Sequence, residues 1–146
     1  MKYEIVNLRE RIILGLSAKT ANDDPEMGKV IGGLWTDFYG KNIYGTIKNP
    51  VNAYSIGLYS DYTDKGYTVT VGREVSTNDN SGMDYKIIPA GRYAKFEIQG
   101  HMQKAVAEAW QKIWNMDLER TFTGDFEEYL DSDMENGHIN IYIAIK

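Results

Sequence analysis

The chain has 146 residues, of which 42% are hydrophobic and 25% are charged, a composition typical of one globular domain spanning residues 1–146. Its 16 basic and 21 acidic side chains argue against a nucleic-acid-binding protein, because phosphate neutralisation requires an excess of Lys and Arg. The absence of cysteine excludes disulfides, thiolate metal sites and cysteine nucleophiles. No apolar run is long enough to cross a membrane, so we expect a cytoplasmic protein with no membrane partner.

The first half of the chain predicts two strands, a helix and two further strands. The helix is expected to begin at Asp23-Asp24-Pro25, where an Asp N-cap precedes a proline, and to end near Gly40. Its apolar residues recur at steps of three and four, which indicates one buried face. From apolar clustering and alternation, strands are expected at 3–8, 11–19, 53–62 and 66–75.

The second half repeats this order after a polar linker at 77–82. An extended stretch at 85–99, interrupted at Pro89-Ala90-Gly91, precedes a helix at 102–116 and strands at 126–130 and 138–145. A shift of 76 positions places Ile12 on Ile88 and Gly15 on Gly91. The sequence therefore predicts two strand–helix–strand–strand units, at approximately 1–76 and 83–146. Two such units packed about a pseudo-two-fold axis would share one core and leave a cleft at their junction.

The segment 125–130 carries the clearest candidate for chemistry. In a strand, Phe126, Glu128 and Leu130 would lie on one face, and Glu127 and Tyr129 on the other. A carboxylate beside a phenol, under a helix that carries Trp110, can attract an organic cation through opposite charge and the ring quadrupoles. The alternative interpretation is a pair of solvated glutamates at a sheet edge.

Other conspicuous residues receive structural interpretations. Trp35 and Trp114 are assigned to core packing. The glycines of the first helix lack the G-x-G-x-x-G order and are assigned to close helix packing: Gly28, Gly32 and Gly33. His101 and His138 lack the spacing of metal ligands and are expected at the surface, so we expect no metal and no other cofactor.

Three stretches of the chain resemble the GyrI-like family of effector-binding domains, and together they cover nearly the full length. They are Lys2-Tyr3-Glu4-Ile5 with Arg11-Ile12-Ile13-Leu14-Gly15, Pro89-Ala90-Gly91-Arg92-Tyr93-Ala94 before the helix holding Ala109-Trp110, and Phe126-Glu127-Glu128-Tyr129 before the closing strand. The resemblance implies an α+β fold of two pseudo-symmetric βαββ units, with antiparallel sheets and a central ligand cleft.

The resemblance also implies roles for individual residues. The family's central glutamate falls on Glu127, its neighbouring aromatic residue on Tyr129 and its helix aromatic residue on Trp110. Tyr59 is the expected cleft residue of the first unit because it lies in the corresponding strand. Tyr93 is added as a further aromatic residue around the ligand.

Three hypotheses for function follow. The first is a free-standing small-molecule-binding protein, in which Glu127 neutralises an amphipathic, cationic ligand among the aromatic residues. The second, also implied by the family, is a hydrolase of electrophilic small molecules in which Glu127 activates water and Tyr129 holds or protonates the substrate. The third, also implied by the resemblance, is a protein-interaction role, with DNA gyrase or a regulator as partner. The chain has no room for a helix-turn-helix domain, so no direct nucleic-acid contact is expected.

Overall fold

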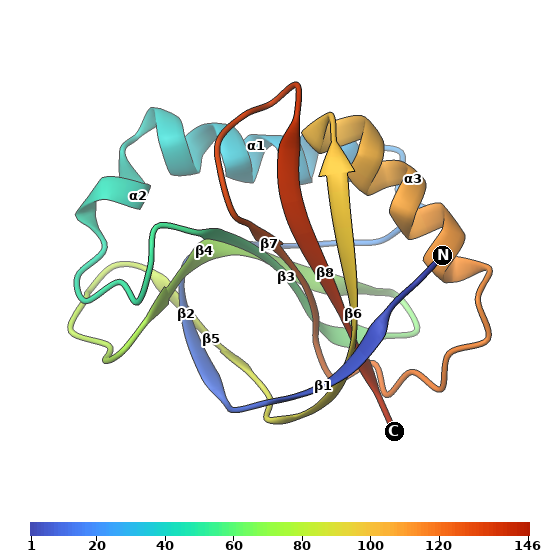
Figure 1. The fold of residues 1–146 in the computed structure, drawn as a ribbon. Coiled ribbons are helices and arrows are strands. Elements are labelled where there is room, and N and C mark those ends of the chain that lie inside the picture. Colours follow the sequence, from blue (N-terminus) through green and yellow to red (C-terminus); the bar gives the residue numbers. More distant parts are fainter.

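The computed structural model describes residues 1–146 as a curved, eight-stranded antiparallel sheet with its helices along one face (Figure 1). The strands are β1 (Glu4–Leu8), β2 (Arg11–Thr20), β3 (Ser55–Thr63), β4 (Gly66–Val75), β5 (Asp84–Ile88), β6 (Gly91–Gly100), β7 (Asp125–Tyr129) and β8 (Gly137–Ile145). The helices are α1 (Met27–Gly40), α2 (Ile43–Thr46) and α3 (Met102–Trp114). The predicted α+β fold is confirmed, and none of the helices is long and apolar enough to span a membrane.

The sheet is built symmetrically about its two central strands. Its order is β1-β6-β8-β7-β3-β4-β2-β5, so β3 of the first unit pairs with β7 of the second. Each unit also places its opening strand in the other half, since β1 pairs with β6 and β5 pairs with β2. This exchange joins the two units into one sheet with one continuous set of backbone hydrogen bonds.

The predicted offset of 76 residues between the units is wrong. The opening strands β1 and β5 begin at Glu4 and Asp84, an offset of 80, whereas α1 and α3 begin at Met27 and Met102, an offset of 75. The offset shortens because six residues connect β2 to α1 while one residue connects β6 to α3. A single shift of 76 therefore places Ile12 of β2 on Ile88 of β5, which is not the equivalent strand, and places Gly15 of β2 on Gly91 of β6 with a register error of four residues.

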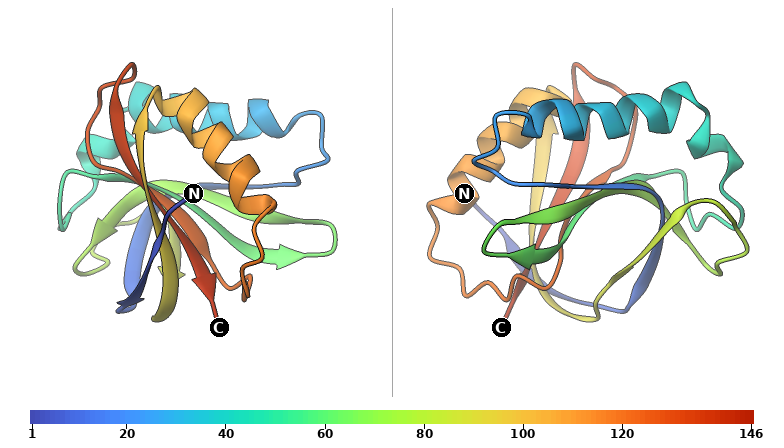
Figure 2. Two further views of the ribbon diagram at one scale, coloured as in Figure 1. Left: turned by 45° about the vertical axis from the view of Figure 1, so that its right-hand side comes forward. Right: turned by 180° about the vertical axis from the view of Figure 1, so that it is seen from behind.

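The core lies on both faces of the sheet. One cluster lies beneath α3 and includes Phe96 and Ile141, and a second lies beneath α1 and α2 and includes Leu14 and Phe38. A third cluster lies on the face opposite the helices and includes Phe126. The sheet is strongly curved, and the helices lie together on one side of it (Figure 2). The third cluster lies on the opposite side.

Helix α1 begins later than predicted. The first helical residue is Met27, and no side chain caps the helix at Glu26. The Asp24 carboxylate instead accepts a hydrogen bond from the Glu26 backbone N–H, within the turn that precedes the helix. The predicted Asp N-cap is therefore a turn-stabilising residue.

Candidate ligand-binding site

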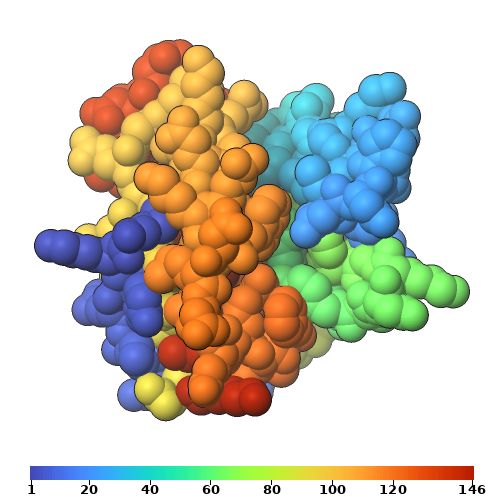
Figure 3. Space-filling model, turned by 90° about the vertical axis from the view of Figure 1, so that its right-hand side faces the viewer, coloured from blue at the N-terminus to red at the C-terminus, as the bar shows by residue number.

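A cleft of about 1560 Å³ lies between α1 and α3, above the central strands of the sheet. Strands β3 and β7 supply its floor, the two helices its walls, and the β3–β4 hairpin one side of its mouth. Figure 3 shows the opening as a hollow between α3 in orange, α1 in blue and the hairpin in green. The cleft is large enough for a ligand with several rings, since pockets for drug-sized molecules are about 300–1000 Å³.

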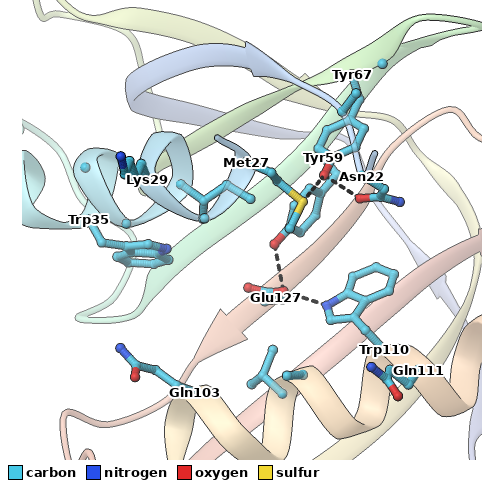
Figure 4. Close-up of a pocket in the computed structure, with 18 of the residues that line it drawn as sticks. Asn22, Met27, Lys29, Trp35, Tyr59, Tyr67, Gln103, Trp110, Gln111 and Glu127 are labelled. Atoms are coloured by element: carbon cyan, nitrogen blue, oxygen red, sulfur yellow. Dashed lines mark hydrogen bonds between the residues drawn. The ribbon is translucent and has the colours of Figure 1, made fainter. Parts of the chain in front are cut away.

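Glu127 lies at the centre of the floor and is held by three hydrogen bonds. Its Oε2 accepts from the Tyr59 hydroxyl at 2.9 Å and from the Trp110 indole N–H at 2.6 Å (Figure 4). Its Oε1 accepts from the Tyr129 hydroxyl at 2.7 Å. The structure thus brings together four of the predicted site residues, from two central strands and α3.

The charge of Glu127 has no cationic partner within the protein. The residue is only 3% exposed, and burial raises the pKa of its carboxyl, while the hydrogen bonds from Tyr129, Trp110 and Tyr59 oppose that rise. The other acidic residues of β7 are paired, because Asp125 contacts Arg120 at 2.6 Å and Glu128 contacts Arg11 at 3.3 Å. Glu127 is therefore the one carboxylate of this strand whose charge remains available to a ligand.

The two tyrosines that donate to Glu127 remain protonated. Burial raises the pKa of Tyr59 well above its usual value, and the nearby Glu127 charge raises it further. The same two causes raise the pKa of Tyr129. Both hydroxyls therefore act as hydrogen-bond donors at all ordinary pH values.

Aromatic rings form the walls around the carboxylate. Trp110 meets Tyr59 edge to face at a centroid distance of 5.4 Å, and Trp35 meets Tyr129 in the same way at 5.1 Å. Trp35 packs against the core cluster beneath α1, as predicted, and it also lines the cleft. Trp114 lines the cleft and is 51% exposed, so its assignment to the core is wrong.

Correct alignment of the two units reveals the signal that sequence reasoning missed. With the helix offset of 75, Trp35 corresponds to Trp110, so the two indoles occupy equivalent walls of the cleft. The shift of 76 positions pairs Trp110 with Leu34 and therefore does not reveal this correspondence. On the floor, Gly57 is the direct cross-strand partner of Glu127, which sequence reasoning did not single out.

Tyr93 lies outside the cleft, which corrects the expectation that it contacts the ligand. It is buried on the opposite face of the sheet, where it packs against Phe126 and donates a hydrogen bond to the Pro89 carbonyl at 2.6 Å. The reason is strand alternation, since its neighbour Ala94 faces α3. The motif that contains Tyr93 does not determine which face of β6 the side chain occupies.

The glycines of α1 do not serve close packing. A Cβ atom placed on Gly28, Gly32 or Gly33 would meet nothing within 4 Å, and all three residues line the cleft. Their missing side chains widen the cleft instead. His101 caps α3, because its Nδ1 accepts from the backbone N–H groups of Gln103 and Lys104.

A sequence model described as "Cass2: Integron-associated effector binding protein" matches residues 4–145. The chain belongs to this family. The resemblance to GyrI-like effector-binding domains is thereby confirmed, and the chain is an effector-binding, small-molecule-binding domain.

One curated relative and two solved structures are similar to this chain. A Bacillus subtilis protein named "Putative transcriptional regulator protein YobU" is 33% identical over 154 residues, covering 97% of this chain and 96% of the relative. The structure of SAV2435 bound to tetraphenylphosphonium has a TM-score of 0.86 at 18% identity, covering 100% and 94% of the two chains. An integron cassette protein of Vibrio cholerae has a TM-score of 0.77 at 24% identity, covering 99% and 95%.

Proposed function

We propose that this protein binds hydrophobic organic cations in the cleft, with Glu127 supplying the opposite charge. The observation that carries the proposal is the environment of the Glu127 carboxylate. The carboxylate is buried and accepts hydrogen bonds from three neutral donors, and no cationic side chain of the protein neutralises its charge. Removing a charge from water without a partner costs several kcal/mol. A cationic ligand offsets that cost, whereas an anion adds repulsion and a neutral molecule leaves the cost in place.

The aromatic walls select for the hydrophobic part of such a ligand. Trp110, Tyr59, Trp35 and Tyr129 surround the carboxylate, and each ring face attracts a cation by about 0.5–2 kcal/mol, depending on desolvation. SAV2435, which shares the fold, was solved with tetraphenylphosphonium, a cation that carries four phenyl groups. The name of the Bacillus subtilis relative, a transcriptional regulator protein, supports a regulatory role.

The geometry suits binding better than proton abstraction. Burial raises the pKa of Glu127, but the three hydrogen bonds that its oxygens accept oppose this rise and occupy three of about four lone-pair sites. A general base needs a free lone pair directed at the proton that it removes. We therefore assign Glu127 to charge recognition.

The test compares tetraphenylphosphonium with tetraphenylborate, an anion of the same shape, by calorimetric titration. The wild-type protein is expected to bind the cation and to exclude the anion. Glu127→Gln should weaken cation binding at least about tenfold, equivalent to about 1.4 kcal/mol. Glutamine fits the site, because its oxygen can accept from Tyr59 and Trp110 while its amide donates to the Tyr129 hydroxyl.

Glu108→Gln is the matched control, because it removes one negative charge from the exposed face of α3. This variant should bind tetraphenylphosphonium as the wild type does. If Glu127→Gln also retains wild-type affinity, or if the wild type binds the borate equally well, the proposal is wrong.

A further inference from the structure

Phe122 lies at the mouth of the cleft with an exposed ring and a strained backbone. Its φ angle is 54°, in the left-handed region, which costs a bulky residue about 1–3 kcal/mol. Its side chain lines the cleft, and the residue is 51% exposed, so burial of the ring cannot repay this cost. Such strain persists only where surrounding groups hold the residue, and it gathers at functional sites.

Two side chains hold the Phe122 ring, and both are anchored on a buried carboxylate. The Arg120 guanidinium carbon lies 4.3 Å from the ring centroid, and the Tyr62 ring meets it edge to face at 5.6 Å. Arg120 and Tyr62 each donate to Asp125 Oδ2 at 2.6 Å. Asp125 is fully buried, and its other oxygen accepts from the Ala144 backbone N–H at 2.8 Å. The ring is therefore fixed by groups that cannot easily move.

A row of rings connects Phe122 to Glu127. The ring centroids of Tyr62 and Tyr67 are 5.9 Å apart, and those of Tyr67 and Tyr59 are 5.7 Å apart. The Tyr59 hydroxyl donates to the Glu127 carboxylate. All of these rings line the same cleft. The cleft thus offers a continuous aromatic surface from its mouth to its central charge.

Charge divides this surface into two parts. The carboxylate of Glu127 carries an unpaired negative charge that favours a positive group at the centre, whereas the Arg120 guanidinium beside Phe122 is paired with Asp125 and offers a cation no such attraction. An uncharged aryl group needs no opposite charge and can pack against the ring of Phe122 and the neighbouring tyrosines. The mouth is therefore suited to the neutral arm of a ligand whose charge lies deeper.

We propose that Phe122, Tyr62 and Tyr67 form an outer aryl subsite that takes an aromatic arm of the bound cation. This inference rests on the proposed function and narrows the ligand class to cations that carry aryl arms. Phe122 is then a specificity-determining residue, and Asp125 and Arg120 are the positioning residues that support it.

The first test measures tetraphenylphosphonium affinity and thermal stability for Phe122→Asn and Phe122→Tyr. Asparagine tolerates the left-handed backbone, so Phe122→Asn is expected to fold without loss of melting temperature. Its affinity should fall about fivefold, on the scale of one lost aromatic contact. Phe122→Tyr keeps the ring and should keep wild-type affinity. A lowered melting temperature with unchanged affinity would assign the ring a purely structural role and overturn the subsite.

The second test observes the contact directly by NMR. The chain has four phenylalanines, and Phe38, Phe96 and Phe126 are fully buried, so Phe122 is the only one accessible to a ligand. Protein with isotopically labelled phenylalanine should show an intermolecular nuclear Overhauser effect between one phenylalanine ring and tetraphenylphosphonium. A bound ligand that gives no such effect overturns the subsite while the proposed function stands. A cation affinity that Glu127→Gln leaves unchanged overturns the proposed function itself.

Discussion

Gly57 and Glu127 are direct cross-strand partners on the two central strands, and the missing side chain of Gly57 makes room for the carboxylate. A Cβ atom at Gly57 would lie 3.1 Å from Glu127 Oε1 and 3.3 Å from Trp35 Cζ2, both closer than ordinary van der Waals contact. Because the pseudo-two-fold axis passes between β3 and β7, the two positions are equivalent. The cleft therefore contains one central carboxylate in place of two that would repel each other.

Gly57→Ala is expected to weaken tetraphenylphosphonium binding about tenfold, or about 1.4 kcal/mol. The added methyl group displaces either the carboxylate or the Trp35 wall. Calorimetric titration measures the effect, and Gly40→Ala is the control, since a Cβ there would meet nothing within 4 Å and the residue lies outside the cleft. Wild-type affinity in Gly57→Ala would show that the site tolerates the methyl group and that the close approach has no role in binding.

Trp110→Phe should shift the pH dependence of binding to higher pH. The indole N–H lowers the pKa of Glu127, so its removal allows burial to raise that pKa further. A cation binds the ionised carboxylate, and its affinity falls as the pH drops through this pKa. Titration of tetraphenylphosphonium across the acidic range should therefore show half-maximal loss at a higher pH than in the wild type.

Trp114→Phe controls for the change of ring, because its indole forms no hydrogen bond with Glu127 and lies on the exposed end of α3. The midpoint of its pH dependence should match that of the wild type. Identical midpoints for Trp110→Phe and the wild type would contradict the assigned role of the indole N–H.

Glu127→Gln should increase the free energy of unfolding at neutral pH. Burial raises the pKa of Glu127 in the folded state above its ordinary value of 4.5, which applies to the unfolded state. At a pH between the unfolded-state pKa and the folded-state pKa, the folded state therefore binds more protons than the unfolded state. The carboxyl therefore destabilises the fold increasingly as the pH rises through this window, and it has no such effect below about 4.5, where both states are protonated. Glutamine removes the effect.

Urea unfolding at neutral and acidic pH measures this difference, with Glu108→Gln as the control for loss of an exposed charge. The higher free energy of unfolding of Glu127→Gln relative to the wild type should disappear on acidification. If this difference in free energy instead grows as the pH falls, the site stabilises the charged form of Glu127.

Two glycine substitutions should change stability in opposite directions. Gly33→Ala should stabilise the protein by about 0.5–1 kcal/mol, because glycine is a poor helix former and the new methyl group meets no other atom. Gly15→Ala should destabilise it by about 3 kcal/mol, because the methyl group would overlap the Val71 carbonyl on the paired strand β4. Denaturant unfolding of both variants measures the effects, and equal free energies would contradict the packing described here.

Local sequence patterns predicted much of the site. Alternation in β7 placed Glu127 and Tyr129 on one face and Phe126 on the other, as the structure shows. Helical spacing located α3 and with it Trp110. These predictions succeeded because the two-residue period of a strand and the 3.6-residue period of a helix depend on neighbouring residues alone.

Other features depended on contacts between distant segments. The equivalence of α1 and α3 on the two sides of the β3–β7 pair identifies Trp35 as the counterpart of Trp110. The placement of Tyr93 required knowledge of which face of β6 lies beneath α3.

The sequence by itself determined the chemistry of the site: which strand carries the carboxylate, and which phenol and indole accompany it. Only the tertiary structure decided that Asp125 and Glu128 are neutralised by arginines while Glu127 is not. The physical reason is that burial and ion pairing depend on the register between strands far apart in the chain, whereas the composition of one strand is written in consecutive residues.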